Sequence, residues 1–390
     1  MKRPEKRKLY LDPNLQIIFA ITLIAMLGMS SITPAFPKMV QELKISSKQV
    51  GLLITVFTMP GVFITPILGI LADRWGRKRI LVPSLMLFGI AGGICSFITN
   101  FYWLLFFRFL QGIGASALGS LNVTLIGDLY AERERTQAMG YNSSVLSIGN
   151  ASYPAIGGAL AMLAWYWPFA LNFIAVPVGF LVLWGLKNPE PRKKQSLSQY
   201  LLSTLSAIKN KKVIGLFLAS LITFIILYGS YLTYFPLLMG LDFKAEPLLI
   251  GLIMSSSSLS TAITSSFLGR LNRYFSEMSL LKMGFVLYII SLIMVPIIPQ
   301  LWMFLFPAII FGIGQGINMP SNQTLLAGLA PIEYRAGFMS LNGMVLRLGQ
   351  TLGPVVIGLF FATRGMPGAF YAGSGFALLM FLLALILIRD

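Results

Sequence analysis

The feature that most constrains this chain is a succession of apolar runs, each long enough to cross a lipid bilayer. These runs lie near 15–36, 48–72, 79–98, 101–127, 138–163 and 166–186, then near 213–238, 247–271, 279–298, 301–328, 337–362 and 367–388. A transmembrane helix needs roughly 20 predominantly apolar residues. Because the bilayer core offers no water to backbone polar groups, each run must satisfy its own hydrogen bonds as a helix. The sequence therefore predicts an all-α membrane protein with twelve transmembrane helices.

Composition agrees with a membrane protein and argues against several other classes. Hydrophobic residues make up 56% of the chain and charged residues 11%, whereas soluble proteins carry about a quarter charged residues. The formal charge of +17 does not indicate a nucleic-acid partner, because the basic residues lie in short loops between apolar runs. There is no His, and Cys95 is the single cysteine. We therefore expect no metal site, no cofactor and no enzymatic activity.

The distribution of Lys and Arg predicts the orientation in the membrane. With the N-terminus inside, most basic residues fall on the cytoplasmic side, and only a few fall outside: Lys38, Lys44, Lys48, Lys244 and Arg364. Basic loops are retained on the cytoplasmic side. The first apolar run is too long for a signal peptide and is expected to remain as a span. A basic linker at 187–212 divides the chain into 1–186 and 213–390, and we expect both termini and this linker in the cytoplasm.

The loop between the second and third runs contains the most specific motif. It reads G-x-x-x-D-R-x-G-R-K-R from Gly69 to Arg79. A loop that only sets topology would need the positive charges but not this order. The order resembles the loop between the second and third helices of the major facilitator superfamily, a group of twelve-helix secondary transporters. The resemblance implies two pseudo-symmetric six-helix bundles and a gating role for the loop.

The gating residues implied by this resemblance belong to the loop and to the end of the fourth run: Gly69, Asp73, Arg74, Gly76, Arg77, Lys78 and Asp128. Gly69 is expected to let two helices approach closely, and Gly76 to permit a tight reversal. In the family, an acid at the position of Asp128 pairs with the loop and stabilises the outward-facing state. The alternative for Asp128 is a helix-end charge without a partner.

An internal repeat at a constant offset of 200 residues supports two related bundles. The matching pairs include Gly69 and Gly269, Gly112 and Gly312, Asn122 and Asn322, Asn142 and Asn342, Gly149 and Gly349, Pro154 and Pro354, and Gly158 and Gly358. The second half has lost the loop motif, because Arg273 stands in place of Asp73 and Ser276 in place of Gly76.

The fourth run carries an intramembrane arginine, Arg108, in the pattern R-x-x-x-G-x-G. A charge inside the bilayer is costly and normally faces a partner or a wet cavity. This pattern resembles the motif of proton-coupled members of the superfamily, in which the arginine is implicated in proton transfer. The alternative is that Arg108 extends to the outer interface without taking part in coupling.

The fifth run resembles the antiporter motif of drug–proton antiporters, G-x8-G-x3-G-P-x2-G-G. The corresponding residues here are Gly140, Gly149, Pro154, Gly157 and Gly158, and Tyr153 replaces the glycine before the proline. The small residues permit close helix packing. The resemblance favours export over uptake, although the same residues also suit an ordinary packed interface.

Polar residues inside the runs are candidates for a substrate cavity between the bundles: Asn122, Asn142, Tyr153, Tyr231, Asn318, Asn322, Arg347 and Gln350. Arg347 is suited to an anionic group because a guanidinium binds carboxylate or phosphate with two parallel hydrogen bonds. The alternative is a structural pairing of Arg347 with backbone carbonyls. No acid lies in the middle of a run. A neutral, amphipathic or anionic substrate is therefore favoured over a cationic drug.

The sequence thus predicts a monomeric, proton-coupled exporter in the inner membrane of a bacterial-type cell, which moves a small amphipathic or anionic compound by alternating access. A proton-coupled importer or facilitator of a small organic anion is the alternative. A membrane sensor that does not transport is less favoured, because no soluble domain is appended to the spans.

Overall fold

The computed structural model describes residues 9–187, 210–329 and 335–388, and over these residues it contains helices and no β-strand. Ten of its helical segments are long and apolar enough to cross a membrane. A segment of this kind is stable in hydrocarbon because its backbone hydrogen bonds are internal. These segments mark the chain as an integral membrane protein.

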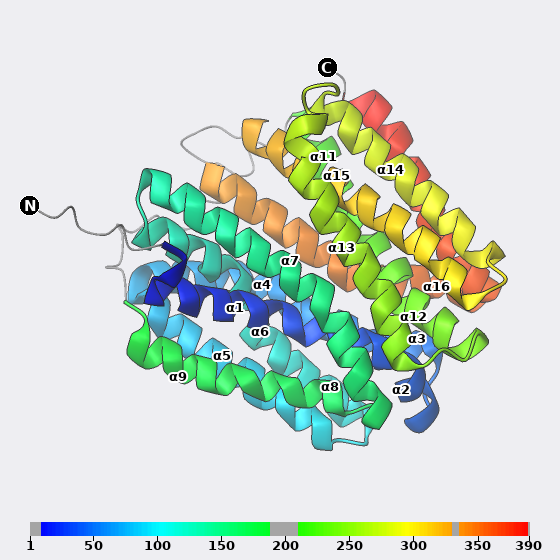
Figure 1. The fold of residues 1–390 in the computed structure, drawn as a ribbon, viewed down its shortest axis with the longest axis horizontal. Helices are drawn as coiled ribbons and strands as arrows, with labels where there is room; N and C mark the ends of the chain where they lie inside the picture. The colour runs from blue at the N-terminus through cyan, green and yellow to red at the C-terminus, as the bar shows by residue number, and fades with distance from the viewer. Residues whose placement is uncertain (1–8, 188–209, 330–334, 389–390) are drawn as a thin grey trace, which may run out of the picture.

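The N-terminal half, residues 9–187, is a set of packed helices (Figure 1). Its helices are α1 (Pro13–Ser30), α2 (Phe36–Glu42), α3 (Ser47–Val50), α4 (Leu52–Trp75), α5 (Arg77–Ile94), α6 (Phe101–Leu129), α7 (Glu132–Leu163), α8 (Trp167–Ala170) and α9 (Ala175–Gly185), with 3₁₀ turns at Leu9–Leu11, Thr33–Ala35, Cys95–Phe97 and Leu171–Ile174. Asp12 and Asn100 begin α1 and α6 by accepting hydrogen bonds from the first backbone N–H groups, which a helix leaves unpaired.

The C-terminal half, described over residues 210–329 and 335–388, is also a set of packed helices (Figure 1). Its helices are α11 (Lys211–Ile225), α12 (Phe235–Leu237), α13 (Pro247–Leu271), α14 (Glu277–Met294), α15 (Leu305–Leu329) and α16 (Arg335–Leu387), with 3₁₀ turns at Val295–Ile297 and Leu301–Phe304. Two π-helical segments, Ile226–Tyr234 and Leu238–Asp242, continue α11. Ser276 begins α14 by accepting the N–H of Ser279.

Two of the expected runs differ from the simple pattern. Helix α7 begins at Glu132 rather than near residue 138, and its many polar residues keep it outside the ten apolar segments. The runs expected at 337–362 and 367–388 are joined in α16, which is interrupted at Gly365 by a φ of +64°. That backbone conformation is open to glycine but strained for other residues. Most of the expected linker at 187–212 lies outside the described residues.

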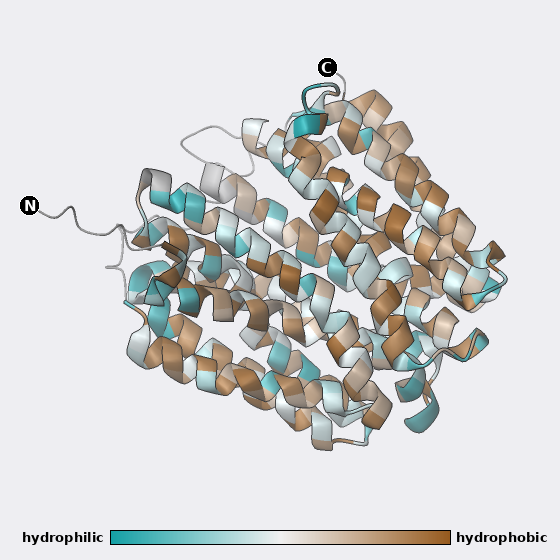
Figure 2. Cartoon of the chain, in the orientation of Figure 1, coloured by the Kyte–Doolittle hydropathy of each residue, from teal (hydrophilic) through white to brown (hydrophobic). Residues whose placement is uncertain are grey.

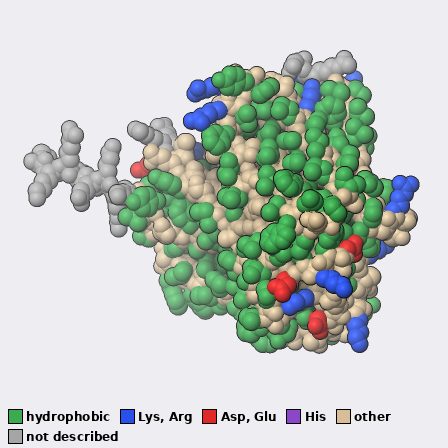
Figure 3. Space-filling model, turned by 45° about the vertical axis from the view of Figure 1, so that its right-hand side comes forward, with side chains coloured by type: hydrophobic (Ala, Val, Ile, Leu, Met, Phe, Trp, Pro, Cys, Tyr) green, Lys and Arg blue, Asp and Glu red, His purple; other side chains and the backbone are tan. Residues whose placement is uncertain are grey.

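The two halves meet along two pairs of helices. Helix α7 packs along α13, and α4 packs along the first segment of α16 (Figure 1). Hydrophobic residues dominate the helices in both halves (Figure 2). They extend over the middle of the face in Figure 3, on which Lys, Arg, Asp and Glu lie near the upper and right edges and in a group in the lower part.

Large aromatic side chains are exposed at both ends of the helices. At one end lie Trp75 of α4, Trp184 of α9 and Tyr274 beyond α13, and at the other end lie Tyr102 and Trp103 of α6 and Trp302 before α15. Their exposed fractions range from 55% for Trp75 to 82% for Tyr274. Trp and Tyr prefer the level of the lipid headgroups. The two groups of aromatic residues form an aromatic belt at each end.

Candidate functional site

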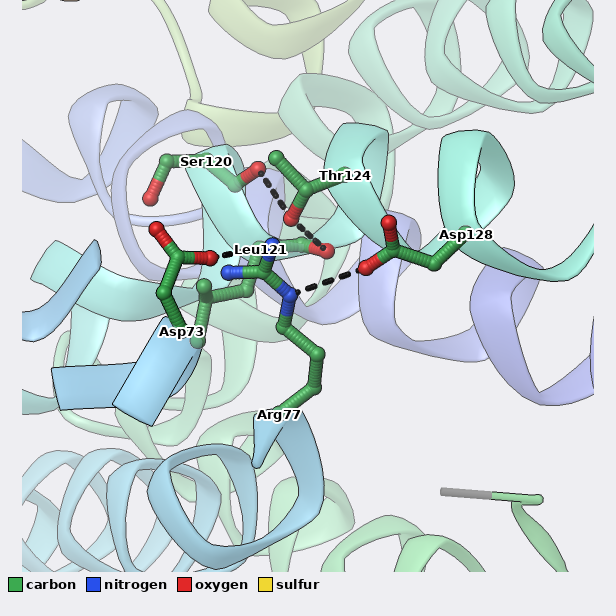
Figure 4. A network of polar contacts seen from close by, with 6 residues as sticks. All are labelled: Asp73, Arg77, Ser120, Leu121, Thr124 and Asp128. Carbon is green, nitrogen blue, oxygen red and sulfur yellow. Dashed lines mark hydrogen bonds and ion pairs between the residues drawn. The ribbon is translucent and has the colours of Figure 1, made fainter. Parts of the chain in front are cut away.

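The predicted loop residues form an ion-pair network between α4, α5 and α6 (Figure 4). The Arg77 guanidinium lies 2.5 Å from a carboxylate oxygen of Asp73, and its Nε donates to Asp128 at 3.1 Å. The side chains of Arg77 and Asp128 are 12% and 13% exposed, whereas that of Asp73 is 52% exposed. The stronger connection therefore runs from Arg77 to Asp128, because water screens the Asp73 contact more.

The two loop glycines behave differently. Gly76 separates α4 from α5 with a φ of +92°, which is the reversal that the sequence predicts. A Cβ added at Gly69 would have no described atom within 4 Å. The close helix approach expected there is therefore absent from this conformation. Lys78 donates to the carbonyl oxygen of Leu186 at 3.3 Å, and Arg74 follows Asp73 in the last turn of α4.

A second polar contact joins α1 to α6 at the same end of the molecule. Tyr130 donates from its hydroxyl to Asp12 at 2.6 Å, and the N–H groups of Asn14 and Leu15 donate to the same oxygen. Burial alone would raise the pKa of the Asp12 carboxyl, but the hydrogen bonds outweigh it and hold this pKa below its ordinary value. We call this end, where α4 and α6 finish and α1 begins, the motif end.

Arg108 is fully buried inside the N-terminal half. It donates to Gln111 at 2.6 Å, to the carbonyl oxygen of Gly28 at 2.9 Å and to that of Leu53 at 3.3 Å. Its guanidinium also lies 4.2 Å from the centre of the Phe57 ring, a favourable contact for a cation. The side chain does not extend to the outer interface, which was the alternative expectation.

The antiporter-like residues of α7 differ in how closely other atoms approach them along the helix. Gly140, near the motif end, has no described atom within 4 Å of an added Cβ. Tyr153, which replaces the motif glycine, covers Gly149, because a carbon of its ring lies 3.3 Å from the Cβ position there. At the opposite end, a Cβ on Gly157 would overlap the carbonyl of Ser31, and one on Gly158 would lie 2.9 Å from the carbonyl carbon of Pro247.

The halves touch each other near the end opposite to the motif end. There α13 approaches α7 at Gly251, where an added Cβ would lie 2.8 Å from the carbonyl carbon of Pro154. The α4–α16 pair repeats this arrangement at Gly51, where an added Cβ would lie 3.1 Å from the side chain of Pro354.

Near the motif end the surroundings of the same four helices are more open. Four glycines, one on each helix, have no described atom within 4 Å of an added Cβ: Gly69, Gly140, Gly269 and Gly343. The close backbone contacts between the halves thus lie toward the opposite end, and Arg347 against Gly61 is a further contact deeper along α4.

Three of the expected cavity asparagines are instead engaged in contacts within a half. In the N-terminal half, Asn122 donates to the hydroxyl of Thr22, which donates to Asn142 at 2.5 Å. The C-terminal half repeats this arrangement. Asn322 donates to Ser220 and Ser220 donates to Asn342, both at 2.7 Å.

Each hydroxyl group therefore ties three helices together, α1 with α6 and α7, or α11 with α15 and α16. All six residues are buried. The carbonyl oxygens of Asn122 and Asn322 have no hydrogen-bond partner among the described residues. Substrate contact by these asparagines stays a prediction.

Two further candidates lie inside the C-terminal half. Asn318 is buried, and its amide oxygen accepts a hydrogen bond from Thr223 at 3.0 Å. The Tyr231 ring is stacked on Phe311 with a centroid separation of 4.4 Å, and on Phe235 at 5.0 Å. Tyr231 is 5% exposed, so its ring belongs to a packed aromatic cluster in this conformation.

Arg347 lies at the boundary between the two halves and is partly buried. Its side chain extends from α16 toward α4, where a Cβ on Gly61 would be 3.1 Å from its Cδ. Gln350 is the one hydrogen-bond acceptor for the guanidinium among the described residues, at 3.4 Å. A guanidinium has five N–H donors, so most of those on Arg347 have no acceptor within the described protein.

The structure also identifies residues that sequence reasoning missed. Thr22 and Ser220 form hydrogen bonds with the buried asparagines. Gly251 lies against the backbone of Pro154, and Gly61 lies against the side chain of Arg347. The repeat contained a usable signal for Gly251, because Gly51 stands 200 residues before it. No group of His, Cys, Asp and Glu suited to a metal ion occurs in the described part of the chain.

Comparison with known proteins gives consistent relatives over almost the whole chain. The chain matches the Major Facilitator Superfamily over residues 18–246 and 229–390. Multidrug resistance protein 1 of Bacillus subtilis is 27% identical over 354 residues, which cover 89% of this chain and 90% of that protein. The Bacillibactin exporter of Bacillus subtilis is 27% identical over 367 residues and 88% of each chain.

A solved structure shares the fold. A bacterial homolog of the human lysosomal transporter Spinster, in an inward-facing and occupied conformation, superposes with a TM-score of 0.82. It is 17% identical, and the match covers 98% of each chain.

Proposed function

The chain belongs to the Major Facilitator Superfamily and is a transporter rather than an enzyme, and we propose that it is a proton-coupled exporter of a small anionic or amphipathic organic compound. The names of two relatives, which refer to multidrug resistance and to export, support this direction of transport. The antiporter-like spacing in α7 supports the same direction.

We propose twelve transmembrane helices in two bundles formed by residues 1–186 and 213–390. Ten apolar segments support this number, together with α7 and the break at Gly365, which divides the 47-residue segment Leu341–Leu387. The basic residues at the motif end support a cytoplasmic position for this end and for both termini. The bacterial relatives support a location in the inner membrane.

In this orientation the conformation faces the cytoplasm. Close backbone contacts between the halves lie on the outer side, at Gly51, Gly158 and Gly251. The open surroundings of Gly69 and Gly269 lie on the cytoplasmic side. Alternating access then consists of rocking the two bundles about the substrate site, so that the outer contacts open while the cytoplasmic ends close. We assign the network of Asp73, Arg77 and Asp128 to the control of this closure.

The observation that carries the substrate proposal is the unused hydrogen-bonding capacity of Arg347. Arg108 is surrounded by acceptors, whereas Arg347 has the single acceptor Gln350 at 3.4 Å in the described structure. A partly buried cation with few acceptors is costly. A carboxylate or phosphate would supply two acceptors in the geometry that a guanidinium prefers. We therefore assign Arg347 and Gln350 to the anionic group of the substrate.

Proton coupling is assigned to Arg108. The described spans contain no mid-membrane carboxylate, and Arg108 is the buried cation of the N-terminal half. Its hydrogen bonds connect α6 with Gly28 of α1 and with Leu53 of α4, and α4 is one of the helices at the boundary between the halves. A change at Arg108 would therefore be transmitted directly to helices α1 and α4.

The test of the substrate proposal is Arg347→Gln, which retains hydrogen bonding and removes the charge. Purified protein in proteoliposomes is assayed with labelled organic anions and neutral amphipathic compounds, with and without a pH gradient. We expect transport of anions to fall by at least tenfold, while the melting temperature and the transport of neutral compounds change little. Equal transport of both classes by the mutant and the wild type would refute the assignment.

A further inference from the structure

The surroundings of Arg347 come from both halves of the chain. The cation itself belongs to α16, but its aliphatic stem lies against Gly61 of α4, at 3.1 Å from Cδ and 3.2 Å from Nε to an added Cβ. Its Nη2 lies 3.8 Å from the Cβ position of Gly119 in α6. The missing side chains at these two glycines leave the space into which the guanidinium extends.

Hydrogen bonds of threonine side chains join α4 to α16 about one helical turn from Arg347. Thr351 follows Arg347 by four residues and donates to its carbonyl oxygen at 2.9 Å. Across the boundary, the hydroxyl of Thr58 lies 3.0 Å from that of Thr351, and Thr55 donates to the carbonyl oxygen of Thr351 at 3.0 Å. When these contacts open, we expect Arg347 to move away from Gly61, because Thr351 lies one turn further along the same side of α16.

We infer that the site for an anionic substrate at Arg347 is assembled from both halves and exists only while the outer contact between α4 and α16 is closed. This inference rests on the proposed function, because it assumes that Arg347 holds an anion. Gly61 and Gly119 are then part of the binding site. They bring the cation against low-dielectric walls, where its attraction for an anion is stronger than in water.

The state dependence would allow the proposed proton gradient to drive export by favouring release on the outer side. In the conformation open to the cytoplasm, the anion meets a partly enclosed guanidinium and binds tightly. Separation of α4 from α16 opens the outer side and simultaneously removes the walls at Gly61 and Gly119, so that water solvates the cation. Affinity is lost at the step that exposes the substrate to the outside. This order of affinities favours release on the outer side.

The test uses a disulfide that locks the outer contact. The single cysteine is first removed by Cys95→Ala, and Thr58→Cys with Thr351→Cys is then introduced. Because the two threonine oxygens are 3.0 Å apart, their replacements are placed to form a disulfide across the boundary. Gly251→Ala, which disturbs the other outer contact at Pro154, supplies a protein biased toward the outward-open state. Gly269→Ala on the same helix is its control, because it meets no described atom within 4 Å.

The probe is carboxyfluorescein, an aromatic carboxylate, and its binding to protein in nanodiscs is followed by fluorescence anisotropy. The neutral dye Nile red is the comparison. We expect the locked protein to bind carboxyfluorescein at least tenfold more tightly than the Gly251→Ala protein, and dithiothreitol to return the locked protein to the wild-type affinity. Gly61→Ala should weaken carboxyfluorescein binding by at least tenfold and leave Nile red unchanged.

The outcomes separate this inference from the proposed function. If Arg347→Gln weakens carboxyfluorescein binding but the locked and Gly251→Ala proteins bind it equally, the inference is wrong and the proposed substrate class stands. If Arg347→Gln changes nothing in any background, or no variant binds the dye saturably, both are wrong. If the disulfide does not form, Gly61→Ala decides, and unchanged dye binding in that variant overturns the inference.

Discussion

The contact between α7 and α13 gives a quantitative prediction, because a single methyl group at Gly251 should hold the two helices apart. The ideal Cβ of Gly251→Ala would lie 2.8 Å from the carbonyl carbon of Pro154 and 3.1 Å from the Cα of Ala155. Carbon atoms in contact are separated by about 3.5–4.0 Å. The helices must therefore move apart by roughly 0.7–1.2 Å, and backbone atoms cannot rotate away as a side chain would.

The magnitude follows from the cost of overpacking, which is typically about 1–3 kcal/mol. The protein can relieve this cost without unfolding by opening its outer side, so the cost acts on the conformational equilibrium. A change of this size corresponds to roughly a 5- to 150-fold shift. We expect Gly251→Ala to shift the population toward the outward-open state by a factor in this range.

The assay is the rate of cysteine labelling at a position behind the contact. Met254 lies one turn beyond Gly251 and is 2% exposed, so Met254→Cys in a Cys95→Ala background reports on opening. A membrane-impermeant maleimide is applied to right-side-out vesicles. Gly251→Ala should raise the labelling rate by the factor above. Gly269→Ala, with no described atom within 4 Å, should leave the rate unchanged.

A second variant protects this test from a simple folding defect. Gly158→Ala places a Cβ 2.9 Å from the carbonyl carbon of Pro247 on the partner helix, and it should accelerate labelling similarly. If both alanine variants fold, transport normally and label at the wild-type rate, the outer contact is not a closed gate, and the reasoning is refuted.

Three further predictions concern the polar contacts. Asp128→Asn should reduce vesicle transport more than Asp73→Asn, because the Asp128 side chain is 13% exposed and that of Asp73 is 52% exposed. A buried charge-assisted hydrogen bond contributes about 1.5–3 kcal/mol. Equal losses of transport in the two variants would contradict this prediction. Arg108→Ala should abolish accumulation driven by an imposed pH difference, and Arg108→Lys should retain at most part of it, because an ammonium cannot reproduce the guanidinium contacts. The depressed pKa of the Asp12 carboxyl contributes stability that is present above its unfolded pKa, about 4, and is lost as pH falls through the lower folded pKa. The melting temperature of the wild type should therefore fall more between pH 5 and pH 3 than that of Asp12→Asn.

The sequence best predicted the features that depend on residues close together in the chain. The apolar runs correspond to helices, and Gly76 adopts the positive φ that its place between two charged helix ends suggested. The contact of Arg77 with Asp128 joins residues that are 51 positions apart in the chain, and the family resemblance, rather than the local pattern, pointed to it. Helix α7 is less apolar than the other spans, and several of its polar side chains are satisfied within it. Ser144, Ser147 and Ser152 donate to backbone oxygens one turn earlier, whereas Asn142 accepts from Thr22 of α1.

The side-chain partners of the buried asparagines were not predictable. The sequence identifies Asn122 and Asn142 as polar residues inside apolar runs, and this pattern fits a substrate cavity and a helix contact equally well. Only the rotation of α1 about its axis brings the Thr22 hydroxyl between them. Arg347 illustrates the opposite case. The sequence showed that Arg347 lies inside an apolar run. It could not show the contact of Arg347 with Gly61, because these residues are 286 positions apart in the chain.

The aromatic belts have a consequence for how the surrounding lipid affects this protein. Trp75 and Trp184 hold one end of the N-terminal half at the headgroup level, and Tyr102 and Trp103 hold the other end. Tyr274 and Trp302 do the same for the C-terminal half. A helix bundle held at both surfaces resists vertical displacement but can still tilt, and tilting changes the hydrophobic thickness that it spans. The length of the lipid acyl chains should therefore change the equilibrium between the inward-open and outward-open states. A bilayer with the same headgroups but a different thickness should alter the transport rate without changing the contacts to the substrate.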